Sequence, residues 1–418
     1  MIGETEPSRE NHTFTYIFAL LSLWFWGMFS ESGWSGSRLL RDVSRNDSTM
    51  KHWILTLIIL IAPILRGADW PIFRGNRGLT GVAAGAVPDQ PVLLWKFDAK
   101  KPVRASAVVG DGRVYFGSDD GEFYALNLAD GKKIWKFDSK DPIEAPALFL
   151  DGRVYFGNSF GKFYALDAKT GIKLWEFETG DQITGGPNWT KSPDGKETYV
   201  IIGSHDFFLY CLNAKTGKKI WEYESENYVN GSPALSNGRT MFGGCDAMLH
   251  IIDIAKGKRQ KSIDAQSHII GSMAAEGGRA YVGHHDCAFL CIDLKTEKVV
   301  WQYKDRLFPY SSSPALTKDR VLFGGEDKRI HCVRRDNGKA VWTFSTRGQV
   351  NSSPVVCGDK VIVGSNDGRL YIVRLKDGKL LSSFETDDSI TASPAVVDGK
   401  IIIGSEDGTL YCLGAKKK

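Results

Sequence analysis

Two recurring groups of polar residues in this 418-residue chain have side chains that could do chemistry. The first group stands near the start of short apolar segments, and its strongest candidates are Arg104, Glu144, Asn230 and Asn351. Carboxylate and amide oxygens can hold a cation such as Ca²⁺, and an arginine can hold a carboxylate. If these segments line a channel, the same positions would also be polar simply because they are wet, and we favour that explanation. The other polar residues in this position are Thr184, Ser311 and Thr391.

The second group is His205, Cys245 and His285, each of which stands two residues after a recurring glycine. Histidine and cysteine are good zinc ligands. Equivalent loops of neighbouring repeats should lie about 10 Å apart, however, given the usual spacing of packed sheets. Ligand bonds of about 2 Å would require these loops to converge, so we expect no metal site here. Aspartates of the same turns recur too regularly for catalysis, and we expect them to bond backbone amides. They are Asp120, Asp206, Asp246, Asp286, Asp327, Asp367 and Asp407.

A repeat of about 40 residues positions both groups. One glycine ends an apolar run in each unit, with spacings of 40, 46, 40, 40, 41, 40 and 40 residues. These glycines are Gly117, Gly157, Gly203, Gly243, Gly283, Gly324, Gly364 and Gly404. The second landmark is a tryptophan, found as Trp95, Trp135, Trp175, Trp221, Trp301 and Trp342. We expect the glycine to permit close approach of a neighbouring segment, and the indole to wedge between units and bond a carbonyl. Lys261 and Ser382 replace the tryptophan and should loosen the fourth and seventh units.

Each unit contains four strand-like segments separated by turn residues. In the second unit we expect strands at 145–149, 154–157, 162–166 and 173–178, with Asp-Gly and Thr-Gly turns between them. Four antiparallel strands repeated in this way are typical of a β-propeller blade. The longest insertion, roughly 190–197, falls between the first two strands of the third unit.

The number of units predicts a closed, all-β, eight-bladed propeller over residues 91–418. The eighth unit ends at residue 413 without a fourth strand, and a spare strand of that type stands first, at 92–97. This N-terminal strand should therefore complete the last blade, which would tie the chain ends together and remove an exposed sheet edge.

The motif Ala165-x-Asp167-x-x-Thr170-Gly171-x-x-x-Trp175 resembles the repeat of pyrroloquinoline-quinone (PQQ) type propellers. The segment from Cys211 to Trp221 is a near copy, and the resemblance covers all eight units. It differs from WD40 propellers, whose Trp-Asp pair lies elsewhere in the repeat. The compact, uninterrupted array resembles outer-membrane-protein assembly factors of the BamB type and, more distantly, quinoprotein dehydrogenases. Residues 69–77 resemble a leader common in exported bacterial proteins with this repeat.

The resemblance implies two functions of different classes. One is a non-catalytic exported scaffold that binds other proteins or envelope components, and a polysaccharide partner is a further variant. The alternative is a PQQ-dependent oxidoreductase of alcohols or sugars. Such enzymes hold Ca²⁺ and a tricarboxylate quinone, and several stack the quinone on adjacent cysteines. Here no two cysteines are adjacent and the units are minimal. We therefore expect no cofactor and no catalysis, with PQQ plus calcium as the alternative.

The N-terminal region predicts export. The apolar runs 16–29 and 53–65 are shorter than the roughly 20 residues of a membrane-spanning helix. Met50-Lys51 followed by the second run resembles a secretory signal at 50–68, with cleavage after Ala68 or retention as a membrane anchor. Translation would then start at Met50. No cysteine precedes Cys211, so we expect no lipid-modified N-terminal cysteine. The predicted organisation is a targeting region 1–68, a leader 69–90 and the propeller 91–418, acting as a monomer in the periplasm or envelope.

Composition limits the remaining possibilities. A formal net charge of +4 is too weak to indicate nucleic-acid binding. The seven cysteines cannot all pair within one chain. Cys211, Cys291, Cys332 and Cys412 occupy core positions of the repeat and should be buried. Cys245 and Cys287 stand in equivalent loops of neighbouring units, where a disulfide is the alternative to the two free thiols that we favour.

Overall fold

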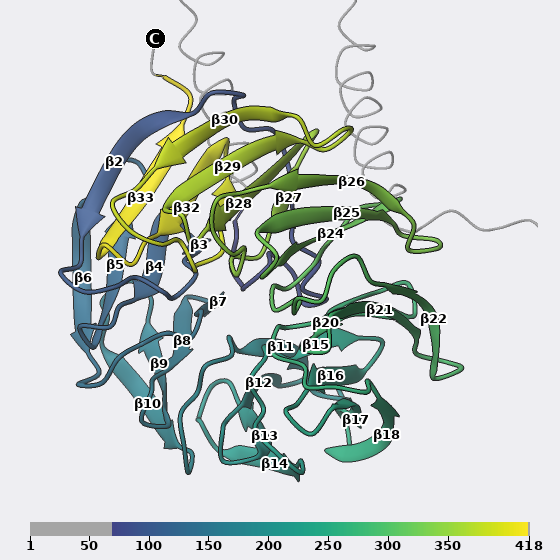
Figure 1. Cartoon of the computed structure of the whole chain (residues 1–418). Coiled ribbons are helices and arrows are strands. Elements are labelled where there is room, and N and C mark those ends of the chain that lie inside the picture. The colour runs from purple at the N-terminus through teal and green to yellow at the C-terminus, as the bar shows by residue number, and fades with distance from the viewer. Residues whose placement is uncertain (1–68, 417–418) are drawn as a thin grey trace, which may run out of the picture. The chain divides into compact units, whose positions relative to one another are not determined.

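A computed structural model describes residues 69–416 of the chain. The predicted signal at 50–68 and the rest of residues 1–68 lie outside this range. Within it, no helix has the length and apolar character needed to cross a membrane. The described residues form eight four-stranded antiparallel sheets arranged as the blades of a propeller, as predicted (Figure 1). One of these sheets gains a fifth strand, β1, from the leader.

We name the strands of a blade A to D, from the innermost to the outermost. Blades one to four are β3 (Val108–Gly110), β4 (Arg113–Gly117), β5 (Glu122–Asn127), β6 (Lys133–Asp138); β7 (Leu148–Leu150), β8 (Arg153–Gly157), β9 (Lys162–Asp167), β10 (Lys173–Glu178); β11 (Asn188–Lys191), β12 (Thr198–Gly203), β13 (Phe208–Asn213), β14 (Lys219–Glu224); β15 (Ala234–Ser236), β16 (Arg239–Gly243), β17 (Met248–Asp253), β18 (Lys258–Asp264). Blades five to seven are β19 (Ala274–Glu276), β20 (Arg279–His284), β21 (Ala288–Asp293), β22 (Lys298–Tyr303); β23 (Ala315–Leu316), β24 (Arg320–Gly325), β25 (Arg329–Arg334), β26 (Ala340–Ser345); β27 (Val355–Cys357), β28 (Lys360–Ser365), β29 (Arg369–Arg374), β30 (Leu380–Glu385). Blade eight is β31 (Ala395–Val397), β32 (Lys400–Gly404), β33 (Thr409–Gly414) and the N-terminal β2 (Val92–Asp98).

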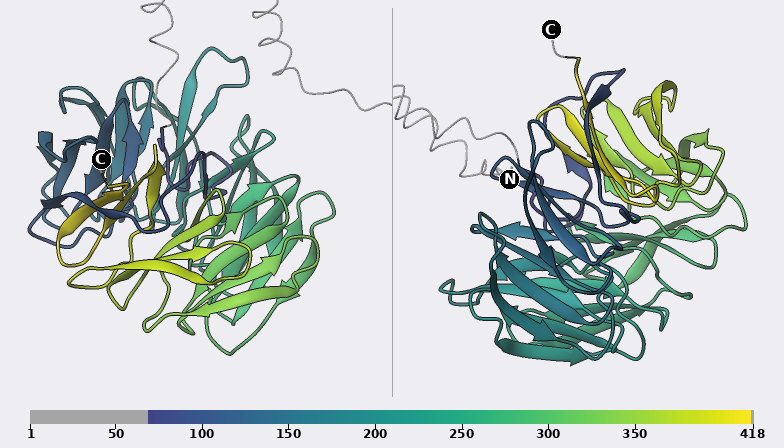
Figure 2. Two further views of the ribbon diagram at one scale, coloured as in Figure 1. Left: turned by 90° about the horizontal axis from the view of Figure 1, so that it is seen from above. Right: turned by 90° about the vertical axis from the view of Figure 1, so that its left-hand side faces the viewer.

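The pairing of β2 with β33 closes the propeller, as the missing fourth strand predicts. The two strands are antiparallel, with Val92 opposite Gly414 and Asp98 opposite Thr409. Figures 1 and 2 show the dark blue β2 beside the yellow β33. The outer edge of blade eight is thus supplied by the start of the repeat region, and every blade has its four strands A to D.

The A strands are shorter than the sequence predicts. In blade two the A strand begins at Leu148 rather than at residue 145, although the insertion of blade three does lie between its A and B strands. Pro146 has no N–H to offer a ladder, which helps to delay the strand there. In most other blades the equivalent residue donates its N–H to a serine of the next blade instead of to a strand; Ser353 N–H, for example, bonds Ser393 Oγ at 3.0 Å.

Six tryptophans on D strands join consecutive blades by one shared geometry. In each case the indole Nε1 donates to a backbone carbonyl in the C–D turn of the next blade, as Trp301 does to Arg335 at 3.0 Å. The ring also lies on the glycine of that turn. At Gly338, where φ is +70°, an added Cβ would come 2.6 Å from the Trp301 ring. The other five indoles bond Leu128, Ala168, Ala214, Ile254 and Leu375 at 2.8–3.2 Å.

The six tryptophans are covered to different degrees. Trp301 and Trp95 are 7% and 8% exposed. Trp135, Trp175, Trp221 and Trp342 are only half-buried, because the D strand is the outermost strand and its outer side faces solvent. The recurring glycine of strand B serves close approach, since a Cβ on Gly117 would come 2.1 Å from Ile143 of the next blade.

The two positions without tryptophan make polar contacts instead, one with the next blade and one with the end of the leader. Lys261 of blade four pairs with Glu297, which stands where the next blade would have its turn glycine. Glu297 has a φ of 62°, so this turn keeps the left-handed conformation without a glycine. In blade seven, Ser382 Oγ donates to the carbonyl of Asp89 at 2.5 Å. The predicted gaps are therefore bridged by polar groups instead of an aromatic ring.

The leader runs along the inner edges of the A strands and joins the blades from within. Trp70 exchanges two backbone hydrogen bonds with Val109 of blade one, and β1 (Val82–Ala83) pairs in parallel with β27 of blade seven. Backbone N–H groups of blades two, four, five, six and seven donate to leader carbonyls at 2.7–2.9 Å; these pairs are Phe149 to Pro71, Leu235 to Arg77, Ala275 to Gly78, Leu316 to Thr80 and Val356 to Gly81. In blade three the Asn188 side chain donates to the Arg77 carbonyl at 2.9 Å.

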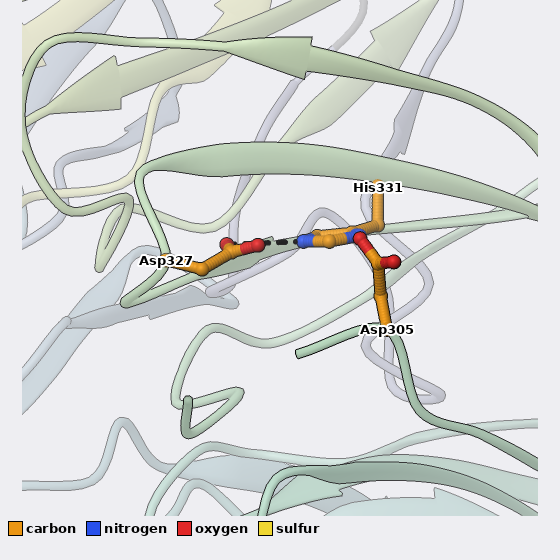
Figure 3. A group of neighbouring side chains, drawn as sticks. All are labelled: Asp305, Asp327 and His331. Atoms are coloured by element: carbon orange, nitrogen blue, oxygen red, sulfur yellow. Dashed lines mark hydrogen bonds and ion pairs between the residues drawn. The ribbon is translucent and has the colours of Figure 1, made fainter. Parts of the chain in front are cut away.

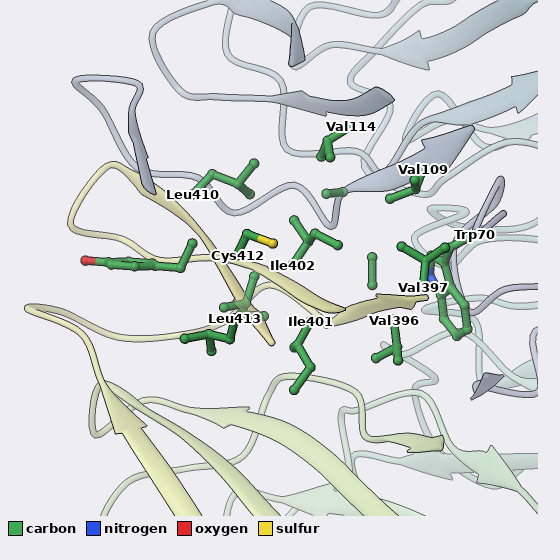
Figure 4. Close-up of a cluster of buried hydrophobic side chains, with 14 of the residues drawn as sticks. Trp70, Val109, Val114, Val396, Val397, Ile401, Ile402, Leu410, Cys412 and Leu413 are labelled. Carbon is green, nitrogen blue, oxygen red and sulfur yellow. The ribbon is translucent and has the colours of Figure 1, made fainter. Parts of the chain in front are cut away.

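The largest buried cluster joins the leader to blades seven, eight and one. It holds Trp70 of the leader together with Val109 and Val114 of blade one and Val396 and Val397 of blade eight (Figure 4). The blades thus share a continuous apolar layer across the point where the chain closes, and the Trp70 side chain of the leader lies on the inner side of this layer. Burying this much aliphatic surface is what makes the closure stable.

Candidate functional site

The two faces of the propeller differ around its axis. The leader occupies the face that carries the A–B and C–D turns, and its Arg74 is 1% exposed. The Arg74 guanidinium donates to the carbonyls of Ser353 (3.0 Å), Pro314 (3.1 Å) and Pro354. Burial lowers the pKa of Arg74 to about 9, which leaves the side chain charged at neutral pH. The axis is therefore filled on this face, although hollows remain between its A–B and C–D turns, one of them lined by Arg77, Asn237 and Glu276. The polar candidates of the sequence lie on the other face, which carries the D–A and B–C loops.

An arc of buried serines lies between the two faces. In six consecutive blades a backbone N–H donates to the serine hydroxyl of the next blade at 2.8–3.1 Å. The donors are Gly186, Ser232, Ser272, Ser313, Ser353 and Ser393; each bonds the serine that follows it in this order, and Ser393 bonds Ser106. Pro146 interrupts the arc in blade two. Because each hydroxyl holds the backbone of the preceding blade, the arc fixes how closely the inner strands approach one another.

The polar residues predicted near the start of the A strands lie at the end of these strands that faces the D–A loops. We call them the polar ring; they are Arg104, Glu144, Thr184, Asn230, Ser311, Asn351 and Thr391. Arg104 is its centre of charge: it pairs with Asp119, with Glu406 at 3.4 Å and with Glu144 at 3.7 Å. Burial lowers the pKa of Arg104, but its bond to Glu406 and the three carboxylates outweigh that effect, so the net shift is upward. Burial raises the pKa of Asp119. One guanidinium is thus shared by three carboxylates, and Thr391 donates to Glu406 at 2.9 Å.

The remaining ring residues pair locally. Asn230 Nδ2 donates to Cys245 Sγ at 2.8 Å, and the Ser311 hydroxyl lies 3.4 Å from Asn351 Oδ1. Thr184 contacts His205 Nε2 at 3.2 Å. The structure therefore brings Arg104 and Glu144 together but engages Asn230 and Asn351 elsewhere, so the four candidates do not form one ligand set.

The histidine and cysteine candidates do not meet either. His205 is held by Gln182 (2.9 Å) and Thr184 and stacks on Tyr228, with ring centroids 4.9 Å apart. Burial lowers the pKa of His205, which favours the neutral ring. Among residues 69–416, the group of three metal-ligating side chains whose ligand atoms lie within 4.8 Å of one another is a different one, Asp305, Asp327 and His331. A histidine in place of the usual tyrosine, four residues after the turn aspartate, was the sequence signal that could have located it.

Five of the seven turn aspartates, all but Asp286 and Asp327, accept the predicted bond from a backbone amide. Asp407 Oδ1 accepts from Thr409 N–H at 2.7 Å, and Asp120, Asp206, Asp246 and Asp367 do the same two residues on. In four blades the other carboxylate oxygen accepts from a tyrosine hydroxyl four residues later, at 2.6–2.7 Å. These carboxylates are therefore structural parts of the B–C turn.

All seven cysteines are free thiols, including Cys245 and Cys287. Cys211, Cys291, Cys332 and Cys412 have no exposed surface, as their core positions predict. Burial raises the pKa of Cys332 and Cys412 to about 12, so these thiols stay protonated at neutral pH. Low-pKa nucleophilic chemistry is not available to them.

Large apolar side chains are exposed in the loops of the open face. Phe160, Phe207, Tyr228, Ile270, Leu307 and Phe308 are 69%, 39%, 41%, 43%, 89% and 45% exposed. They belong to B–C turns and D–A loops from blade two to the start of blade six. We call these six residues the apolar loop set.

Phe207 is held in a conformation that costs energy. Its φ of 79° lies in the left-handed region, where Gly121, Gly161, Gly368 and Gly408 occupy the equivalent place in four other blades. A side chain there costs roughly 1–2 kcal/mol. The Phe207 and Tyr228 rings lie 5.4 Å apart, so the strained turn presents an aromatic pair to solvent.

A family model described as outer membrane protein assembly factor BamB matches residues 86–303 and 306–417. No curated protein matches the chain in sequence. Among solved structures, BamB from Moraxella catarrhalis is 18% identical with a TM-score of 0.67, over 78% of this chain and all of that one. The quinohemoprotein alcohol dehydrogenase from Comamonas testosteroni is 16% identical with a TM-score of 0.72, over 84% and 81%. A computationally designed protein, Ika8, is 16% identical with a TM-score of 0.69, over 77% and 99%. At these identities the likenesses establish the fold.

Proposed function

Because this chain belongs to the family of outer membrane protein assembly factor BamB, we propose that it is a non-catalytic, exported propeller scaffold that binds other proteins or components of the cell envelope. The observation that carries the proposal is the contrast between the two faces. One is filled by the leader around the axis, and the other exposes the apolar loop set on short loops. A rigid disc with such a face offers a contact surface without an assembled reaction centre.

The strained Phe207 supports contact by the open face. Glycine stands in four of the equivalent turns, and Ala247, Cys287 and Lys328 stand in three others with φ of 60–65°. Among the side chains held there at a cost, that of Phe207 is the large aromatic one, and its ring lies 5.4 Å from that of Tyr228. Aromatic side chains are also the residues most enriched at the centres of protein interfaces. We therefore place the partner over blades two to six of the open face.

The alternative, a quinone-dependent alcohol or sugar dehydrogenase, has less support. A tricarboxylate cofactor needs several cations or donors, since an unpaired buried carboxylate costs several kcal/mol. Arg104 is already shared by Asp119, Glu144 and Glu406, and these carboxylates would repel the cofactor. Titration of the purified protein with PQQ and Ca²⁺, read by absorbance, tests this alternative. Saturable binding that disappears in Arg104→Ala or Glu144→Ala would contradict the scaffold proposal and support the enzyme alternative.

Site-specific photo-crosslinking in intact cells tests the scaffold proposal. The photoreactive residue replaces Phe160 or Phe207 on the open face, or Ile172 in a C–D turn, an aliphatic residue whose exposure of 65% is close to the 69% of Phe160. We expect discrete adducts with envelope proteins from positions 160 and 207 and none from 172. Adducts from position 172 alone, or the same adducts from all three positions, would contradict the assignment of the face.

Export is the second part of the proposal and has its own test. A phosphatase that is active only outside the cytoplasm, fused after Lys418, should be active in cells that make the full chain. The activity should fall when residues 50–68 are deleted. A fusion that remains inactive and fractionates with cytoplasmic protein would refute export while leaving the face assignment open to the crosslinking result.

A further inference from the structure

Blade six carries a compact cluster of Asp305, Asp327 and His331 that the proposed function does not use (Figure 3). Asp327 lies in the B–C turn and His331 in β25, while Asp305 comes from the loop that leaves β22 of blade five. The His331 and Asp327 side chains have no exposed surface, and His331 Nε2 lies 3.1 Å from Asp327 Oδ1. Asp305 is about one third exposed in its side chain, so the cluster opens to solvent on one side.

The carboxylate of Asp327 is incompletely bonded. Its Oδ2 is buried and has no hydrogen-bond partner among the described residues. Equivalent aspartates differ: Asp407 accepts from Thr409 N–H through one oxygen and from the Tyr411 hydroxyl through the other. Buried carboxylate oxygens are normally paired, since leaving one unpaired is costly. The bare oxygen of Asp327 therefore points to a ligand that completes it.

An extra residue in the loop brings Asp305 to this place. Nine positions separate Trp301 from Tyr310, whereas eight separate Trp342 from Val350 and the equivalent pairs of the other blades. At the position of Asp305 other blades have Ser, Thr or Ala, such as Thr346, whose hydroxyl bonds the B–C turn of its own blade at 2.9 Å. Asp305 instead reaches blade six, where Arg329 Nη1 lies 3.1 Å from its Oδ2. A third ligand thus arrives from the neighbouring blade.

We propose that Asp305, Asp327 and His331 bind a divalent transition-metal ion, with Zn²⁺ as the preferred ion and water completing its coordination. Tetrahedral ligand bonds of about 2.0–2.2 Å place ligand atoms about 3.3–3.6 Å apart, so His331 Nε2 and Asp327 Oδ1, now 3.1 Å apart, would separate by a few tenths of an ångström to admit the ion. The mixed imidazole and carboxylate set favours zinc over calcium or magnesium. Tyr303 holds the other ring nitrogen of His331 at 3.1 Å, in the manner of the outer partners that orient metal ligands. On binding, Asp305 exchanges its pairing with Arg329 for the metal.

The ion would link blade five to blade six through the loop that carries Leu307 and Phe308. This loop belongs to the open face, so the metal would order part of the apolar loop set. The inference stands on blade six alone and does not depend on the proposed function.

Blade four supplies an internal comparison, because Asp246 and His250 form the same pair at 2.7 Å, with Tyr223 at 3.0 Å from the ring. Asp246 is completed by backbone bonding, and Ser225 stands where blade five has Asp305.

Titration of the metal-free purified chain with Zn²⁺, followed by calorimetry, tests the proposal. We expect one saturable site per chain, and we expect Asp305→Ser to weaken it by at least about tenfold. Asp305→Ser changes only an exposed loop residue to the type that the repeat usually has, so it should fold as the parent does. His250→Gln is the matched control in blade four and should leave the affinity unchanged.

Each of the following results would contradict the proposed zinc site. Absence of saturable binding, or an affinity that Asp305→Ser leaves unchanged, would show that Asp327 and His331 only replace the usual Asp–Tyr pair of the turn. Equal loss in His250→Gln and Asp305→Ser would place zinc elsewhere. A second readout is the thermal unfolding midpoint, which a given Zn²⁺ concentration should raise by the same amount in the parent and in His250→Gln and by less in Asp305→Ser.

Discussion

The two sides of blade five solve the same packing problem with different chemistry. Toward blade six, Trp301 lies on Gly338 and donates to the Arg335 carbonyl. Toward blade four, a lysine stands in the tryptophan position and a glutamate in the glycine position, and Lys261 pairs with Glu297. The aromatic contact needs a residue without a side chain beneath it, whereas the ion pair needs a side chain at that same place. The repeat therefore constrains the two positions jointly rather than one by one.

The difference also has an energetic side. The Trp301 side chain is almost fully covered and its N–H is satisfied, so its removal opens a cavity and leaves a carbonyl unpaired. Lys261 and Glu297 are 47% and 32% exposed in their side chains, and ion pairs at such positions contribute roughly 0–1 kcal/mol. We expect the Trp301 junction to be much the stronger of the two.

Replacing Trp301 by alanine should have the largest effect on this comparison. We expect a loss of about 3–5 kcal/mol in the free energy of unfolding, typical of a buried aromatic residue cut back to alanine. Urea unfolding followed by circular dichroism, with a chelator present, measures it. An unchanged urea midpoint would show that the indole does not hold the blades together.

Substituting valine for Gly338 should destabilise the same junction from its other side. The new Cβ would lie 2.6 Å from the Trp301 ring, in a residue whose φ is +70°. We expect a cost of about 2–3 kcal/mol from the left-handed backbone and the displaced ring. In the Trp301→Ala background the steric part should disappear, so the combined loss should be smaller than the sum of the two single losses. Strict additivity in this double-mutant cycle would contradict a direct contact.

Converting the charged junction into an aromatic one should stabilise the protein. The double variant Lys261→Trp with Glu297→Gly restores the pair found at six other junctions, and we expect a gain of about 1–2 kcal/mol from apolar burial. Lys261→Trp alone should gain less, because the Glu297 side chain occupies the place of the ring. A double variant no more stable than this single one would show that the two positions act independently.

Removing the ion pair alone should have the smallest effect. Lys261→Ala should change the free energy of unfolding by less than about 1 kcal/mol, and the difference from the parent should shrink further as salt is raised. Lys256→Ala, a change of another lysine in the turn that precedes the same strand, is a control for general charge effects. A loss comparable with that of Trp301→Ala would mean that the charged junction is as strong as the aromatic one.

The spacing of the landmarks was enough to predict the number of blades and their closure. Gly117 and its equivalents must each lie against the next blade, so their count is the count of blades. The closing strand followed because Val92–Asp98 has the sequence of a D strand and the last unit lacks one. The start of the A strand in blade two was wrong because Pro146 has no N–H to pair with a strand, and in most other blades the equivalent N–H bonds a hydroxyl of the next blade, which a strand pattern does not show.

The residues of the candidate site were harder to predict from the sequence than the fold was. Arg104 and Glu144 were found because they share a repeat position, but Asp119 and Glu406, which also pair with Arg104, stand at another. The path of the leader could not be predicted, since it bonds mainly through backbone groups that every residue possesses. Asp305 was missed because it stands alone at a repeat position that otherwise holds Ser, Thr or Ala, and the sequence does not show that its side chain turns toward the neighbouring blade.

The leader also sets a limit on how this protein can change its number of repeats. Between Trp70 and Gly81 its residues are used in order, from Val109 in blade one to Val356 in blade seven. A tandem duplication of one 40-residue unit in the gene would add inner-strand donors with no leader residue opposite them, and a deletion would leave leader carbonyls over the wrong blade. The length of the leader thus has to match the number of blades that it contacts around the propeller axis. Copy number, which unequal recombination changes readily in repeat genes, becomes a property that must change together with the leader.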